Sequence, residues 1–133
     1  MSTDFQHLLP ISSDAFIKKL DNWSIQYKYF EHVPLRTVNE SKSVQDIFLS
    51  AEQGGGHIKN LFLRDHKKNN ILIVAHQDAL IDLKNLQLKI GAGRLSFGSS
   101  NRLMEHLGVF PGAVTPFSMI NGVQKNVVLF MDL

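Results

Sequence analysis

The stretch GGGHIKNLFLRDHKKNNILIVA, residues 54–75, decides the fold of this chain. Its two apolar runs, 58–64 and 71–75, have the length and composition of buried strands. The segment between them, 65–70, is polar and carries Asp and Asn residues, which suit a tight turn. The stretch therefore predicts a β-hairpin at the centre of a sheet.

Three elements are expected before the hairpin. Apolar residues at helical spacing predict a helix over 14–23, with Ser13 as its cap. Residues 26–32 alternate and are rich in aromatic side chains, which is typical of a strand. A short helix is predicted over 43–51, and the glycines at 54–56 end it.

Two helices and a final strand are expected after the hairpin. The first helix spans 82–89, and the second begins at Ser99 or Ser100 and ends at Leu107. Residues 127–130 are apolar and predict a buried strand. Strands and helices mix without a regular βαβ rhythm, which predicts an α+β fold, with a mixed, largely antiparallel sheet or barrel and flanking helices.

Length and composition exclude several classes of protein. The chain has 133 residues, which suits one domain spanning 1–133. It contains no cysteine, which excludes disulfides, thiolate metal ligands and a cysteine nucleophile. The N-terminus lacks the pattern of a secretory signal, and no apolar run approaches the ~18 residues of a membrane span, so we expect a cytoplasmic protein. The net charge of +2 is low for a protein that wraps a duplex, but it suffices for one that touches the end of an RNA strand.

Lys59 stands out because it is a cation in an otherwise apolar strand. Alternation places it with Leu61 and Leu63 on one face and puts Asn60 on the other. The preceding glycines do not make a phosphate loop, in which the lysine directly follows a glycine and precedes Ser or Thr. Two explanations remain, a functional lysine that faces a ligand and an edge-strand lysine that guards against aggregation.

The segment FPGAVTPFSMIN, residues 110–121, is too apolar for a solvent loop and too broken by proline and glycine for a strand. Such a segment can fix a rigid turn whose backbone N–H and C=O groups face a ligand. A buried connector that packs Val114 and Phe117 is an equally good explanation.

The six histidines lack the spacing of metal ligands, so neither a metal site nor a cofactor is expected. His57 is a candidate neighbour of a site, whereas His66 and His106 are expected at the surface. Asp78 and Asp82 suit the cap of a helix better than a catalytic carboxylate pair. No G-x-S-x-G motif occurs, so a Ser-His-Asp triad has no support.

Several motifs follow one another in a fixed order over about residues 25–133. They are YKYFEHVPLRTV (27–38), GGGHIKNLFLRD (54–65), the IDLKNL region (74–86), RLSFGS (94–99), LMEHLGVFPGAVTPF (103–117) and Asn121. In this order and spacing they resemble the YbaK/ProX family of aminoacyl-tRNA deacylases, in particular the branch related to the editing domain of bacterial prolyl-tRNA synthetase.

The resemblance implies a hydrolase that deacylates mischarged tRNA(Pro), above all Ala-tRNA(Pro), by attack of water on the aminoacyl ester without metal or cofactor. Lys59 corresponds to the family's functional lysine, which contacts the terminal adenosine or its phosphate, and we expect it to point into the same pocket as the turn at 112–116. The backbone of that turn would hold the aminoacyl group. The full set of implied substrate-binding residues is Asn60, Phe97, Gly112, Ala113, Val114, Thr115, Pro116, Phe117 and Asn121.

The implied partners are the acceptor end of mischarged tRNA(Pro) and prolyl-tRNA synthetase, with no membrane. One departure from the family is expected at the end of the chain, where members usually continue with a histidine-containing segment that lines the site. Two alternatives stay open, and this departure supports the first of them. The chain is a non-catalytic paralogue that holds tRNA ends or a synthetase, or it deacylates Cys- or Ser-charged tRNA. An intact Lys59 favours an enzyme over a pure binder.

Overall fold

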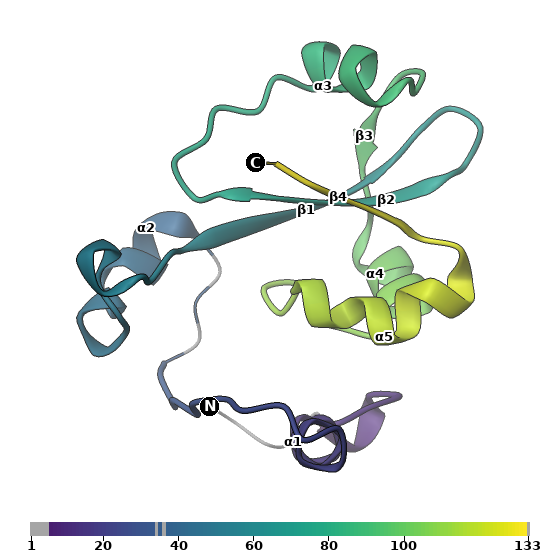
Figure 1. Ribbon diagram of the computed structural model, residues 1–133. Helices are drawn as coiled ribbons and strands as arrows, with labels where there is room; N and C mark the ends of the chain where they lie inside the picture. The colour runs from purple at the N-terminus through teal and green to yellow at the C-terminus, as the bar shows by residue number, and fades with distance from the viewer. Residues whose placement is uncertain (1–5, 34, 36, 133) are drawn as a thin grey trace.

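A four-stranded sheet with the strand order β3-β1-β2-β4 organises the computed structural model, which describes residues 6–33, 35 and 37–132. The strands are β1 (Ile58–Arg64), β2 (Asn70–His76), β3 (Ser96–Phe97) and β4 (Val128–Met131). The α-helices are α1 (Ser13–Asn22), α2 (Val38–Lys42), α3 (Leu83–Ile90), α4 (Ser100–Leu107) and α5 (Met119–Gly122). Helix α3 lies on one side of the sheet, and α4 and α5 lie on the other (Figure 1).

The central hairpin is confirmed. β1 and β2 pair antiparallel, with Leu61 opposite Ile73. Asp65 closes the turn, because its Oδ1 accepts hydrogen bonds from the backbone N–H groups of Lys67 and Asn69, both at 2.9 Å. Its Oδ2 accepts a third from the side chain of Asn69, also at 2.9 Å.

The sheet is mixed and open, so the α+β prediction is confirmed without a closed barrel. β1 pairs antiparallel with β3, whereas β2 pairs parallel with β4. The final strand expected over 127–130 is present, but its expected burial is wrong: Val127 is buried, whereas the residues of β4 are exposed or half-buried. β4 forms one edge of the described sheet, where it has a single neighbouring strand and little cover.

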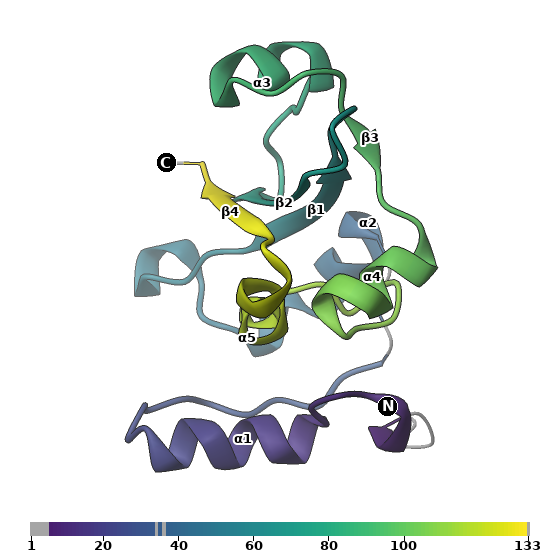
Figure 2. The ribbon, with the colours of Figure 1, turned by 90° about the vertical axis from the view of Figure 1, so that its right-hand side faces the viewer.

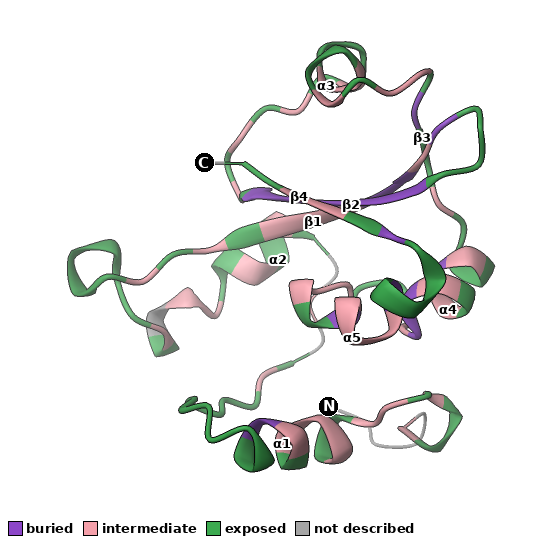
Figure 3. Ribbon diagram, turned by 45° about the vertical axis from the view of Figure 1, so that its right-hand side comes forward, coloured by how far each residue is buried: buried purple, intermediate pink, exposed green. Residues whose placement is uncertain are grey.

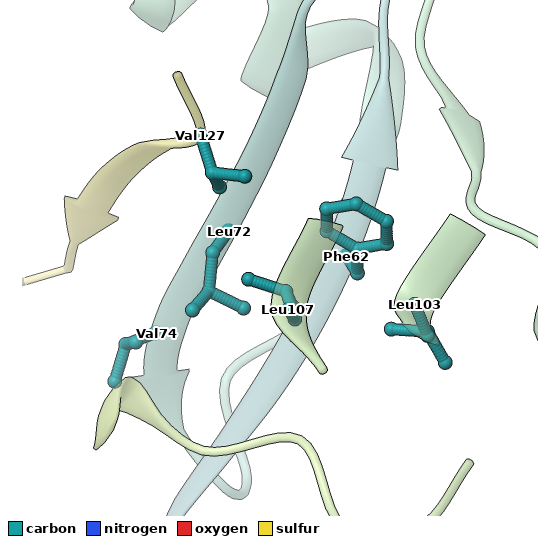
Figure 4. Packing of buried hydrophobic residues seen from close by; sticks show 6 residues of the cluster. All are labelled: Phe62, Leu72, Val74, Leu103, Leu107 and Val127. Atoms are coloured by element: carbon teal, nitrogen blue, oxygen red, sulfur yellow. The ribbon is translucent and has the colours of Figure 1, made fainter. Parts of the chain in front are cut away.

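Two hydrophobic clusters cover the two faces of the sheet. Side chains of a strand alternate between faces, so neighbouring residues of β1 join different clusters. The first cluster, shown in Figure 4, fills the space between the sheet and α4 and consists of Phe62, Leu72, Val74, Leu103, Leu107 and Val127. The second packs against α3 and consists of Leu63, Ile71, Ile73 and Leu95.

Three predicted helices are confirmed within one or two residues. Ser12, Asp82 and Ser99 act as N-caps of α1, α3 and α4, each accepting a backbone N–H through its side chain. α3 and α4 end at Gly91 and Gly108, which have left-handed backbone conformations. No helix within the described parts of the chain is long and apolar enough to span a membrane.

Two expectations before the hairpin are wrong. Residues 26–32 form no strand, because the described sheet offers them no hydrogen-bonded neighbour, and most of their side chains are exposed (Figure 3). The helix expected over 43–51 is replaced by α2 and two short 3-10 turns. Thr37 forms a capping box with Glu40 and therefore starts the helix earlier than the apolar pattern indicates.

Candidate functional site

A pocket of about 580 Å³ lies between the N-terminal segment and the segment from Gly108 to Asn121. Its N-terminal wall includes Leu9, Ile11 and Phe16. Of the residues expected to bind substrate, those that line the pocket are Gly112, Ala113, Thr115, Phe117 and Asn121. We call this space the 108–121 pocket.

The turn over residues 112–116 is held by its own hydrogen bonds. Gly112 has a φ of 88°, in the left-handed region that favours glycine. Thr115 accepts the N–H of Phe117 and opens a short 3-10 turn at Pro116, while Ser118 Oγ accepts the N–H of Thr115. Among the described residues, no acceptor pairs with the backbone N–H of Gly112 or Val114. The turn therefore keeps two donors for a ligand.

Asn60 joins β1 to this turn. Its Nδ2 donates a hydrogen bond to the carbonyl oxygen of Val114 at 3.1 Å. Its Oδ1 is buried and has no hydrogen-bond partner within the described structure. The side chain of Val114 packs against the first cluster, whereas Phe117 is 60% exposed. The segment is thus part buried connector and part pocket wall.

Asn121 fastens the far end of the same segment. Its Nδ2 donates to the carbonyl oxygen of Leu107 at 3.2 Å, at the end of α4. A Cβ on Gly108 would lie 2.6 Å from this nitrogen, so the close approach requires glycine. Asn121 lines the pocket, but its amide N–H is engaged in holding the helix end.

Lys59 lies on the other face of β1. Its ammonium group donates to the carbonyl oxygen of Ala79, in the loop that leads to α3. Leu61, two residues along the strand, packs with the second cluster, while Asn60 faces the turn. The expected approach of Lys59 to residues 112–116 is therefore not observed, because successive side chains of a strand point to opposite faces.

The surroundings of Lys59 are polar and charged. Asp78 accepts a hydrogen bond from Lys42 at 2.8 Å, and this bond, aided by the charges of Lys42 and Lys59, lowers the pKa of Asp78 against an opposing effect of burial. Asp78 thus forms an ion pair instead of the expected helix cap, which Asp82 alone provides. β3 pairs only with the last two residues of β1, so the strand around Lys59 is also a local sheet edge.

Phe97 is also remote from the pocket. It pairs with Leu63 across β1 and β3, is 65% exposed and is not among the lining residues. The aromatic wall comes instead from Phe16 of α1, whose ring centroid lies 4.9 Å from that of Phe117. The sequence showed Phe16 only as part of an apolar helix face, and nothing in the sequence indicated which segment that face meets.

The histidines do not gather at the pocket. His66 is exposed, as expected. The surface position expected for His106 is wrong, because its side chain is only 18% exposed and packs near the ring of Phe62. His57 contacts the ring of Phe48 edge-on, at 6.0 Å between centroids. Within the described residues, no group of three or more His, Asp or Glu side chains is placed to hold a metal ion.

Comparison with known proteins places the chain in a family. The model of the aminoacyl-tRNA editing domain matches residues 32–133. The prolyl-tRNA editing protein ProX of Acetoanaerobium sticklandii is 42% identical over 122 residues, which are 91% of this chain and 71% of that protein. Prolyl-tRNA synthetase associated domain-containing protein 1 of Mus musculus is 34% identical over 106 residues, which are 77% of this chain and 59% of that protein.

A solved structure supports the fold. The crystal structure of the hypothetical protein APE2540 superposes on 88% of this chain and 72% of that chain, with a TM-score of 0.64 and 19% identity. This likeness concerns the fold alone. The domain match and the identity to ProX concern the sequence itself and extend over most of the chain. The chain therefore belongs to the aminoacyl-tRNA editing domain family, the YbaK/ProX family that its motifs resemble.

Proposed function

We propose that this chain is a hydrolase that removes a wrongly attached amino acid from tRNA(Pro), with Ala-tRNA(Pro) as its main substrate. Its relative from Acetoanaerobium sticklandii is a prolyl-tRNA editing protein. The observation that carries the proposal is the turn at 112–116, whose two unpaired N–H groups lie in a segment that lines an apolar pocket. Backbone N–H donors of this kind can stabilise the negative charge that develops on the carbonyl oxygen of an ester when water attacks it.

The aminoacyl group would occupy the 108–121 pocket, with its ester carbonyl at the N–H group of Gly112, which lines the pocket. Lys59 would contact a phosphate of the bound RNA strand. Because Lys59 and the pocket lie on opposite faces of β1, a substrate that engages both must cross the beginning of this strand. The glycines at 54–56, just before His57 and the strand, leave little bulk there.

In the reaction, the oxygen of water bonds to the carbonyl carbon while the charge on the carbonyl oxygen is stabilised by the turn. The bond between that carbon and the ribose oxygen then breaks. The proton released by the water ends on the ribose oxygen, so the products are the free amino acid and uncharged tRNA. The neighbouring ribose hydroxyl helps to orient the water. The ester is already activated, so positioning and oxyanion stabilisation suffice.

Discrimination between alanine and proline would rest on size, with the correct product excluded from the site. A difference of one methylene is worth only about 1–3 kcal/mol, which is why a second site adds to the accuracy of a synthetase. The proposal therefore includes the acceptor end of tRNA(Pro) as substrate, prolyl-tRNA synthetase as the source of the error, and the cytoplasm as the compartment.

The test is deacylation by the purified chain. Ala-tRNA(Pro), Cys-tRNA(Pro) and Pro-tRNA(Pro), labelled in the amino acid, are incubated with the protein, and release of the amino acid is compared with spontaneous hydrolysis. Rapid release of alanine with Pro-tRNA(Pro) spared is expected. Faster release of cysteine would show that Cys-tRNA(Pro) is the main substrate. Binding of uncharged tRNA without release of any amino acid would show that the chain is a binding module and not an enzyme.

A further inference from the structure

An aromatic and basic stripe runs along α1, away from the 108–121 pocket. Phe16 lies at the pocket, Lys19 follows one turn later, and Trp23 directly follows the helix. At the angular spacing of an α-helix these three positions fall within about 60° of arc. Asp14 and Asp21, the acidic residues of α1, lie about 140° or more from Phe16, on the opposite side.

The stripe is open to a ligand. Trp23 is 55% exposed, and the ammonium group of Lys19 lies over its ring at 5.9 Å from the centroid. Leu20, on the same side of the helix, is buried, and Phe16 at the start of the stripe lines the 108–121 pocket. Figure 2 shows α1 lying beside α4 and α5 and apart from the sheet.

We infer that this stripe, Phe16, Lys19 and Trp23, binds the single-stranded 3′ end of the tRNA acceptor arm. The inference rests on the proposed function, which places the aminoacyl ester at the pocket end of the stripe. Aromatic side chains stack on bases of any sequence, and a cation between them meets the phosphates. Phe16 and Trp23 are separated by about 10 Å along the helix, a span that a few nucleotides bridge.

The stripe lies outside the part of the chain that the editing-domain model covers, residues 32–133. The pocket is large for alanine alone, at about 580 Å³, and its aromatic lining consists of Phe16, Phe110 and Phe117, of which Phe16 and Phe117 are in ring contact. The terminal base would therefore stack on this pair, and the next nucleotides would follow the stripe toward Trp23. The N-terminal segment thus supplies binding for the RNA strand, while the turn at 112–116 supplies the chemistry.

The test measures binding of two RNA hairpins of the acceptor arm, one ending in single-stranded CCA and one without it. In fluorescence anisotropy, the full chain is expected to prefer the hairpin with CCA. Trp23→Ala should weaken this binding by roughly tenfold or more, whereas Trp23→Phe, which keeps a ring, should retain most of it. Lys19→Gln should reduce the slope of log affinity against log salt by about 0.7.

Tyr29→Ala is the matched control, because Tyr29 is 57% exposed and lies outside α1. It should leave binding unchanged. Equal effects of Trp23→Ala and Tyr29→Ala, or equal weakening for both hairpins, would overturn the inference. Self-association of the protein that Trp23→Ala abolishes, with RNA binding intact, would overturn it in favour of a second copy of the chain.

Deacylation distinguishes this inference from the proposed function. If Ala-tRNA(Pro) is hydrolysed, Trp23→Ala should raise KM and leave kcat close to the wild-type value. If neither Trp23→Ala nor Lys19→Gln affects hydrolysis, the proposed function is supported and the inference that the stripe binds RNA is contradicted. If the protein prefers the CCA hairpin in a way that depends on Trp23 but hydrolyses no substrate, the inference about the stripe is supported and the proposed enzymatic activity is contradicted.

Discussion

The side chain of Asn60 donates a hydrogen bond to the carbonyl oxygen of Val114, across 54 residues of sequence. This bond connects the central strand β1 to the turn that carries the unpaired N–H groups of Gly112 and Val114. Because Asn60 is paired with Val74 of β2, the bond ties the turn to the sheet. The orientation of the proposed oxyanion donors therefore depends on Asn60.

Asn60→Ala should reduce deacylation of Ala-tRNA(Pro) through kcat and should lower the free energy of unfolding by roughly 1–3 kcal/mol, since it leaves the carbonyl of Val114 without a donor. Single-turnover kinetics and urea unfolding measure the two effects. Asn101→Ala, an exposed change on α4, is the control and should alter neither. Wild-type kcat in Asn60→Ala would show that the turn does not need this support.

Gly112→Ala should abolish most deacylation, because a methyl group would stand where the aminoacyl group approaches the backbone. The same change also places alanine at a positive φ, which costs about 1–2 kcal/mol. Gly54→Ala separates the two effects, since Gly54 has a nearly equal φ of 86° and open space around its Cβ position, away from the pocket. Both variants should lose similar stability in thermal unfolding, but only Gly112→Ala should lose turnover.

Lys59→Ala should weaken deacylation and binding of tRNA while changing the unfolding temperature little, because the lost side chain is half-buried and makes one hydrogen bond to Ala79. Lys59→Arg should keep part of the activity through its charge. Lys84→Ala, an exposed change on α3, is the control. If Lys59→Ala aggregates but the soluble fraction turns over substrate at the wild-type rate, the lysine guards a sheet edge instead.

Asp65 should make the hairpin sensitive to acid. The hydrogen bond from the Asn69 side chain has the largest effect and lowers the pKa of Asp65 below its ordinary value of 3.8. Burial opposes it, and the backbone N–H groups of Asn69 and Lys67 lower the pKa further. The folded state thus favours the ionised carboxylate. Its stabilisation is fully present above pH 3.8 and is lost as the pH falls through the lower folded pKa.

Asp65→Asn should therefore lower the free energy of unfolding by roughly 1–3 kcal/mol at neutral pH. Its difference from the wild type should shrink as the pH falls below 3.8 and through the lowered folded pKa of Asp65. Urea unfolding followed by circular dichroism at several pH values measures this. Asp132→Asn, at an exposed position near the end of β4, serves as the reference. A stability difference for Asp65→Asn that stays constant with pH would contradict the assigned role of the carboxylate.

The sequence by itself determined the central hairpin and three helices. The turn chemistry at Asp65 and Asn69, the caps at Asp82 and Ser99, and the glycine at 108 all act on residues within a few positions of themselves. Local signals of this kind are readable because their partners are close in the chain. The motifs likewise led to the family, and alternation along β1 already separated Lys59 from Asn60.

Only the tertiary structure decided which surfaces meet. Residues 26–32 have the pattern of a strand, but a strand exists only where another supplies hydrogen bonds, and the described sheet supplies none there. The same holds for the pocket: the turn at 112–116 became one wall because Asn60 and Asn121 fix it, and Phe16 became the other because α1 folds back onto Phe117. Contacts between segments distant in sequence depend on the packing of the whole chain, which periodicity and capping do not encode.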